Sequence, residues 1–181
     1  MGLTPATQNQ VPEHSILDYF NKQTYLGNAF SFPIGPETIN STNETPIALI
    51  LNPALAAGVA FPNQKALFQN LRTTASDIAS GDGTTFFRYY LNPTIATQGT
   101  KTTPINCRPA SATTSIASCY VNGQFTVSSN GTLARVITAG YSSINDSNLL
   151  FILDPGQSLL VTAQPVTSGA TIINANSWYE L

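Results

Sequence analysis

Short apolar runs, each followed by residues that favour turns, recur along most of this chain and restrict what it can fold into. The runs are four to eight residues long and rich in β-branched or aromatic residues, which is typical of β-strands. They cover residues 46–51, 66–71, 85–91, 124–127, 132–138, 149–153, 158–162 and 171–178. Glycine, proline, asparagine and aspartate separate the runs, and helical periodicity is almost absent. The chain is therefore predicted to be all-β.

Alternating side chains support the strand prediction in residues 85–91, whose sequence is Thr-Phe-Phe-Arg-Tyr-Tyr-Leu. Successive side chains of a strand point to opposite faces, so Phe87, Tyr89 and Leu91 should share one face. The residues between them, which include Arg88, then lie on the other face. We expect the aromatic residues of this strand to pack in the core or in a subunit interface.

Turn chemistry completes the fold prediction. Asp-Pro-Gly-Gln at residues 154–157 lies between two apolar runs and predicts a hairpin, because proline presets φ and glycine tolerates a positive φ. Asn-Gly pairs at 122–123 and 130–131 predict further turns. We predict a single β-sandwich domain of jelly-roll-like architecture over residues 25–181, preceded by an extended N-terminal arm over residues 1–24.

A low content of charge distinguishes this chain from an ordinary soluble domain. Charged residues make up 9% of the 181 residues, against about 25% in a typical domain. Seven Tyr and nine Phe argue against disorder. Hydroxyl and amide side chains replace the missing charges, and they cost less to desolvate than ion pairs do. Such a surface suits permanent, close-packed assembly, although many secreted β-proteins share it.

Charge and hydropathy also exclude two classes of partner. The net charge is −2, and the seven Lys and Arg are scattered, so no basic run exists to neutralise the phosphates of a nucleic acid. No segment approaches the run of about 18 apolar residues that a membrane helix needs. The first residues lack the pattern of a secretory signal. We therefore expect a soluble protein, made in a cytosol, with neither nucleic-acid nor membrane partners.

Residues that could perform catalysis are few. The single histidine, His14, lies beside Glu13 in the polar arm, where a solvated side chain is expected rather than a general base. Four aspartates lie in turn-like sequence: Asp77, Asp82, Asp146 and Asp154. They match the pattern of a calcium loop poorly. We expect no catalytic residue, no cofactor and no metal, and thus no enzyme.

The two cysteines, Cys107 and Cys119, flank a stretch rich in Ser and Thr. Two cysteines cannot form a zinc site alone. A protein made in a cytosol usually keeps its thiols reduced. Two unpaired thiols are therefore the favoured interpretation, and a disulfide is the alternative.

Motifs in the second part of the chain occur in a characteristic order. Residues 85–94 (TFFRYYLNPT) are followed by Gly-Thr at 99–100, Thr-Pro-Ile-Asn at 103–106 and a Ser/Thr-rich stretch. Leu-Asp-Pro-Gly-Gln-Ser-Leu follows at 153–159, before an aromatic and acidic end at 178–180. From about residue 66 onward this order resembles that of small head decoration or minor capsid proteins of tailed phages. The cysteines and the N-terminal arm are not part of that pattern.

The resemblance implies a structural protein of the virion, a β-sandwich of the cement type. Such a protein binds the major capsid protein, forms homo-oligomers, often trimers at three-fold positions, and stabilises the shell. The alternative is a glycan- or receptor-binding module of a viral fibre or tail, which would expose an aromatic cluster: Tyr89, Tyr90, Trp178 or Tyr179. A third hypothesis, a virion-associated hydrolase, requires His14 or a carboxylate pair in a pocket.

Overall fold

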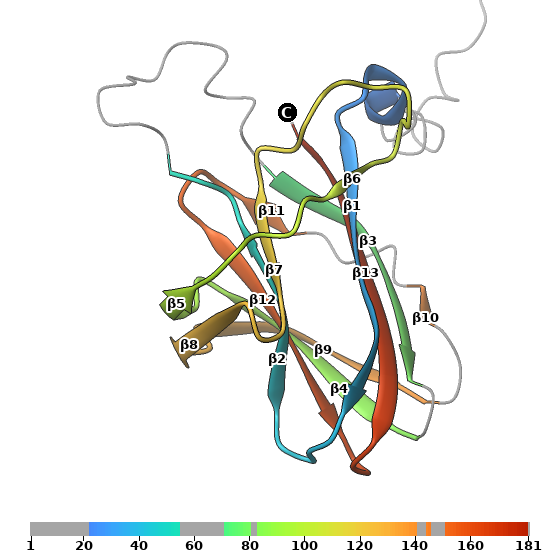
Figure 1. Cartoon of the computed structure of the whole chain (residues 1–181), viewed down its shortest axis with the longest axis vertical. Coiled ribbons are helices and arrows are strands. Elements are labelled where there is room, and N and C mark those ends of the chain that lie inside the picture. Colours follow the sequence, from blue (N-terminus) through green and yellow to red (C-terminus); the bar gives the residue numbers. More distant parts are fainter. Residues whose placement is uncertain (1–21, 55–70, 81–82, 141–143, 146–150, 181) are drawn as a thin grey trace, which may run out of the picture.

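The computed structural model describes residues 22–54, 71–80, 83–140, 144–145 and 151–180 (Figure 1). These residues form thirteen strands, arranged in two main sheets and a small two-stranded ribbon. A helical turn over residues 22–26 precedes the first strand. The prediction of an all-β, sandwich-like fold is confirmed.

Sheet A has the strand order β10-β3-β13-β1-β6, and β11 also pairs with β3. Its strands are β1 (Ala29–Ile39), β3 (Leu71–Ser80), β6 (Ile105–Asn106), β10 (Ile144–Asn145), β11 (Ile152–Leu153) and β13 (Ala170–Glu180). Sheet B has the order β7-β2-β12-β4-β9. Its strands are β2 (Thr45–Leu51), β4 (Thr85–Leu91), β7 (Ser118–Val121), β9 (Thr132–Ala139) and β12 (Ser158–Pro165). The ribbon pairs β5 (Thr94–Gln98) with β8 (Phe125–Ser129).

The antiparallel pairs are nested one inside the next along the sequence. The innermost pair along the sequence is β4 with β9. The next pair outward joins β3 to the two short strands β10 and β11. The pairs β2 with β12 and β1 with β13 follow outward. The strands β1 to β4 alternate between the two sheets, and so do β9, the β10 and β11 segments together, β12 and β13, so this nested pairing forms the double-sheet arrangement of a jelly roll. Strands β5 to β8 form an insertion between β4 and β9.

The main core lies between sheets A and B, and its side chains come from alternate residues of the strands. In β4 the fully buried side chains include Phe87 and Tyr89, whereas Arg88 is partly exposed, as the alternation predicts. Strands β1 and β13 contribute Phe30 and Trp178, whose ring centroids lie 6.4 Å apart. Burying side chains of this size contributes about 1.5–3 kcal/mol each, so this layer dominates the stability of the domain.

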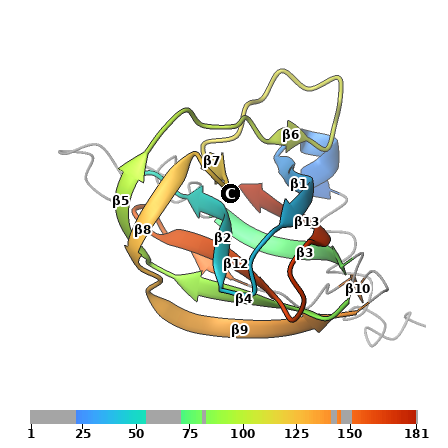
Figure 2. The same ribbon diagram turned by 60° about the horizontal axis from the view of Figure 1, so that its bottom comes forward.

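A second, smaller core lies on the outer face of sheet B. Its buried residues are Leu49, Tyr120, Phe125 and Leu160, and Tyr90 packs partly against them. Phe125 belongs to β8, so the β5–β8 ribbon covers part of this face as a third layer. Figures 1 and 2 show β5 and β8 beside sheet B, on the side away from sheet A.

The hairpin predicted at residues 154–157 is wrong, although the turn itself is present. The N–H of Gln157 donates to the carbonyl of Asp154 at 2.9 Å, and Gly156 has a φ of 88°. However, β11 before the turn pairs in sheet A, whereas β12 after it pairs in sheet B. The turn therefore passes the chain from one sheet to the other. Local turn chemistry sets the reversal of direction but not the strand that each flank pairs with.

Two further predictions fall largely outside the described residues. They are most of the run over residues 66–71, of which only Leu71 is described, and the arm over residues 1–24 as far as residue 21. The last three residues of the predicted arm belong to the helical turn, and the side chain of Gln23 is 6% exposed. It accepts a hydrogen bond from the side-chain amide of Asn28 at 3.1 Å, which joins this turn to the start of β1.

Candidate functional site

The acidic and histidine residues singled out in the sequence are not brought together in the described part of the chain. His14, Glu13, Asp82 and Asp146 lie outside the described residues. The expectation that Asp77 lies in a turn is wrong, because it lies within β3 and pairs with Ala175 of β13. Asp154 is exposed and opens the turn between β11 and β12, where its N–H donates to the side-chain oxygen of Gln157 at 2.8 Å. Within the described ranges, no group of three or more His, Cys, Asp or Glu residues could hold a metal ion.

The two cysteines carry free thiols. Cys119 is fully buried on β7, and Cys107 is partly buried just after β6. Burial raises the pKa of both thiols, and the Glu180 carboxylate raises that of Cys119 further. A thiol acts as a nucleophile only when it is ionised. The buried thiol of Cys119 is therefore suited to packing rather than to chemistry.

Three of the four aromatic residues proposed for a sugar-binding patch are in the interior. Tyr89 and Trp178 are fully buried, and Tyr179 is 4% exposed. The exposure that the glycan-binding alternative requires is therefore absent at these three residues, because the side chains of Tyr89 and Trp178 point from β4 and β13 into the main core. Tyr90, on the opposite face of β4, is partly exposed.

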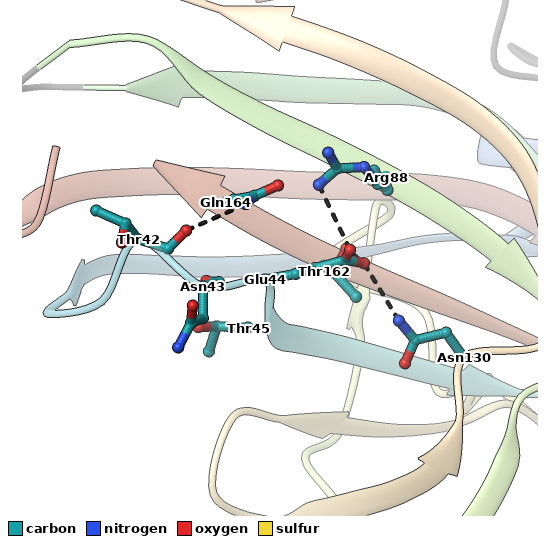
Figure 3. Close-up of polar contacts among 8 residues, drawn as sticks. All are labelled: Thr42, Asn43, Glu44, Thr45, Arg88, Asn130, Thr162 and Gln164. Atoms are coloured by element: carbon teal, nitrogen blue, oxygen red, sulfur yellow. Dashed lines mark hydrogen bonds and ion pairs between the residues drawn. The ribbon is translucent and has the colours of Figure 1, made fainter. Parts of the chain in front are cut away.

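A carboxylate cluster on the outer face of sheet B is centred on Glu44, just before β2 (Figure 3). Its Oε1 atom accepts hydrogen bonds from the hydroxyl of Thr162 at 2.7 Å and from Nδ2 of Asn130 at 3.2 Å. Its Oε2 atom lies 3.5 Å from a guanidinium nitrogen of Arg88. Burial raises the pKa of the nearby Tyr90 hydroxyl, and the Glu44 carboxylate raises it further.

The Glu44 cluster connects segments that are far apart in the sequence. Thr162 lies on β12, Arg88 on β4 and Asn130 in the turn between β8 and β9. Next to the cluster, Gln164 donates to the carbonyl of Thr42 at 3.1 Å (Figure 3). These contacts satisfy the carboxylate with donors from the protein itself. The arrangement fixes the β1–β2 connection onto sheet B.

A second carboxylate cluster is centred on Glu180 at the end of β13, where the residue is 9% exposed. Its carboxylate accepts hydrogen bonds from the hydroxyl of Ser115, from the N–H of Ile116 at 2.9 Å and from Nε1 of Trp178 at 3.1 Å. This cluster holds the long connection between β6 and β7 against β13. Sequence reasoning noted the acidic end but gave no signal for its partners.

Large apolar side chains that are exposed complete the set of surface features. They are Tyr25, Leu26, Ile105, Leu133, Val136, Ile152, Val166 and Ile173. Two of them, Leu133 at 50% and Val136 at 47% exposure, lie on the same edge strand, β9. At another place Tyr25 is 74% exposed, and the guanidinium of Arg108 lies 5.2 Å from the centroid of its ring. Tyrosine and arginine are enriched among the residues that dominate protein interfaces.

Fold and surface together define a jelly-roll domain in which two carboxylates fasten loops to strands and apolar side chains face outward. No protein-family model matches the chain, and a search of curated proteins finds no similar sequence. Among the described residues, no helix has the length and apolar character that crossing a membrane requires.

Proposed function

We propose that this chain is a non-enzymatic structural protein of a virus particle, of the capsid decoration or cement type. On this proposal it binds the major capsid protein and further copies of itself, and it functions in the virion after synthesis in the host cytoplasm. Its role is mechanical, because added interface area between capsid subunits opposes the separation of the shell.

The observation that carries the proposal is the way the domain uses its few charges. Glu44 and Glu180 are partly or largely buried and bind donors from the protein itself. Glu37, on β1, accepts a hydrogen bond from the side-chain amide of Asn122 in the turn between β7 and β8. Much of the remaining surface is hydroxyl, amide and apolar. Such a surface meets another protein with little desolvation cost and little charge repulsion.

The fold is compatible with this role, but proteins with other functions share it. Jelly rolls occur in viral capsid proteins, and they also occur in lectins and in cupins. A specific contact needs about 800 Å² of surface from each partner. Two polar clusters and the third layer fix long connections in place, so the domain can present such an area with little further ordering. Pre-ordered contacts lose less free energy on binding than mobile ones.

A glycan- or receptor-binding module of a viral fibre or tail is the second candidate. Phe86, Arg88 and Tyr90 are all partly exposed on the outward face of β4. The guanidinium of Arg88 lies 5.7 Å from the centroid of the Phe86 ring. Aromatic faces beside polar donors can stack on sugar rings. A glycan array separates the two candidates, because the cement proposal predicts no saturable sugar binding.

The cement proposal is tested with the purified chain and with shells of its virus from which the protein has been removed. Co-sedimentation to a saturating ratio, together with a higher melting temperature of the loaded shells, would support it. Shells that neither bind the chain nor gain thermal stability would exclude it. The chain sedimented without shells is the matched control, because it reports any self-aggregation.

A further inference from the structure

The edges of the two sheets differ in how they are protected within the described part of the chain. On sheet A, the edge of β1 is paired with the two-residue strand β6 and carries Pro33 and Pro36, with a register shift after Ile34. The opposite edge of sheet A is made by two-residue strands, β10 and β11. Short strands, prolines and bulges are the usual devices that prevent edge-to-edge pairing.

Sheet B has one short edge and one long edge. The strand β7, at one side, has four residues. At the other side lies β9, which has eight residues and pairs only with β4 among the described strands. Figure 2 shows β9 as the outermost strand of its sheet. Its sequence contains no proline, no lysine and one charged residue, Arg135. A short length and prolines, which protect the other edges, are therefore missing here, and the one register shift of β9 lies near its start.

The direction of the backbone groups of β9 follows from its neighbours. The N–H of Asn92, just after β4, donates to the carbonyl of Ser158 on β12 at 2.9 Å. In an antiparallel sheet, successive residues of a strand direct their backbone N–H and C=O groups alternately toward one neighbouring strand and toward the other. Even-numbered residues of β4 therefore form backbone hydrogen bonds with β12, and odd-numbered residues form them with β9. Their partners between 135 and 139 on β9 are also odd-numbered. Val136 and Thr138 consequently direct their N–H and C=O groups away from β4.

The side chains at this edge favour contact as well. Val136 is 47% exposed and Thr138 is exposed, both on the outer face of sheet B, and Leu133 is 50% exposed near the start of the strand. Valine, threonine and leucine pack well across paired strands. The register shift of β9 lies between Leu133 and Arg135, so residues 135–139 form a regular edge.

We propose that β9 pairs in an antiparallel manner with β9 of a second copy of this chain, about a two-fold axis at Ile137. Val136 of each copy then lies opposite Thr138 of the other, and each such pair exchanges both N–H···O bonds. The pairing joins two five-stranded sheets into one continuous sheet. It deepens the proposed self-association and rests on that part of the proposed function.

Charge supports a second copy as the occupant. An axis at Ile137 places Arg135 opposite Ala139 of the other copy, so the two arginines do not face one another. Like charges directly opposite would destabilise a pair of strands. A two-fold contact of this kind produces closed pairs rather than open fibres. If the copies also form trimers through another surface, the same contact joins one trimer to another.

The test is the solution mass of the full chain, measured by light scattering, for the wild type and for Val136→Lys. The variant places two lysines close to the two-fold axis, so it should halve the mass and weaken the association at least tenfold. Val166→Lys is the matched control, because Val166 is 59% exposed in the turn after β12, and it should leave the mass unchanged. Thermal unfolding of both variants confirms that they fold.

A second variant removes a backbone donor instead of adding a charge. Thr138→Pro deletes an N–H that faces away from β4, a position at which an edge strand tolerates proline. It should halve the mass as well. A wild-type monomer, or a mass that both variants leave unchanged, would overturn the pairing. Binding of Val136→Lys to shells is scored separately, so loss of the pairing can be distinguished from failure of the capsid proposal.

Discussion

Replacing Glu180 by alanine should destabilise the domain far more than the loss of an ordinary surface carboxylate. The Glu180 side chain lies at the end of β13 and is almost inaccessible to solvent. It accepts hydrogen bonds from Ser115, Ile116 and Trp178. Alanine would remove the acceptor for all three groups at once, and the connection between β6 and β7 would lose its attachment to β13.

The magnitude follows from the donors that lose their acceptor. The indole N–H of Trp178 belongs to a fully buried residue, and the N–H of Ile116 is part-buried. A buried donor without an acceptor costs about 1–3 kcal/mol, and bonds to a charged group lie toward the upper end. The hydroxyl of Ser115 can turn to water, and the N–H of Ala117 still donates to it at 3.0 Å. The expected loss is about 4 kcal/mol, a large part of a typical stability of about 5–15 kcal/mol.

Urea unfolding followed by tryptophan fluorescence measures this loss directly. Trp178 is the only tryptophan, and it lies beside the substituted residue. With a slope of about 2 kcal/mol per molar urea, the midpoint should fall by about 2 M. Glu37→Ala is the matched control, because its hydrogen bond to Asn122 is exposed, and its cost should stay within about 1 kcal/mol. Equal, small effects of the two variants would refute the reasoning.

Three further predictions concern turns, the third layer and pH. Gly131→Ala should lower the free energy of unfolding by well above the roughly 1 kcal/mol expected for Gly123→Ala. Both glycines have a positive φ, but a Cβ at Gly131 would lie 2.4 Å from a backbone oxygen, whereas a Cβ at Gly123 would meet nothing within 4 Å. Leu160→Ala should cost about 2–5 kcal/mol in urea unfolding if the ribbon covers sheet B, and a cost below 1 kcal/mol would contradict this layer. The pKa of Cys119 is raised by burial, so the folded protein keeps a proton that the unfolded chain releases. The contribution of Cys119 to stability is therefore fully present below a pH of about 8.5, the pKa of the thiol in the unfolded chain, and it decreases as the pH rises above that value. From pH 8 to pH 10 the wild type should lose about 1–2 kcal/mol more than Cys119→Ala, and parallel pH profiles would argue against this effect.

Strands with regular side-chain alternation were predictable from the sequence. The run over residues 85–91 is β4 with the same bounds, and its buried face is the one that alternation indicates. Strand β1 was missed because Pro33, Gly35 and Pro36 interrupt the pattern expected of a strand. The structure accommodates these residues with a shift of register between Ile34 and Glu37, which no local pattern announces.

The polar clusters could not have been predicted, for a different reason. Glu44 and Thr162 are 118 positions apart in the sequence, and their hydrogen bond exists only after β2 and β12 have paired. The same holds for Ile116 and Glu180, which are separated by 64 positions. The sequence shows that carboxylates are scarce. Which distant donors they meet depends on the topology, and a single sequence does not display it.

The order of strands has a consequence for how the chain folds during synthesis. Strand β13 lies between β3 and β1, and β12 lies between β2 and β4, so the last two described strands occupy the middle of both sheets. Until the ribosome has made residues 158–180, neither sheet can close, and the edges of four earlier strands stay without their partners. Contacts between such distant segments form slowly, and open strands attract other chains in the meantime. Surfaces that require the finished sandwich therefore arise only after synthesis has passed β13, so an incomplete chain would not present the surface that the proposed assembly uses.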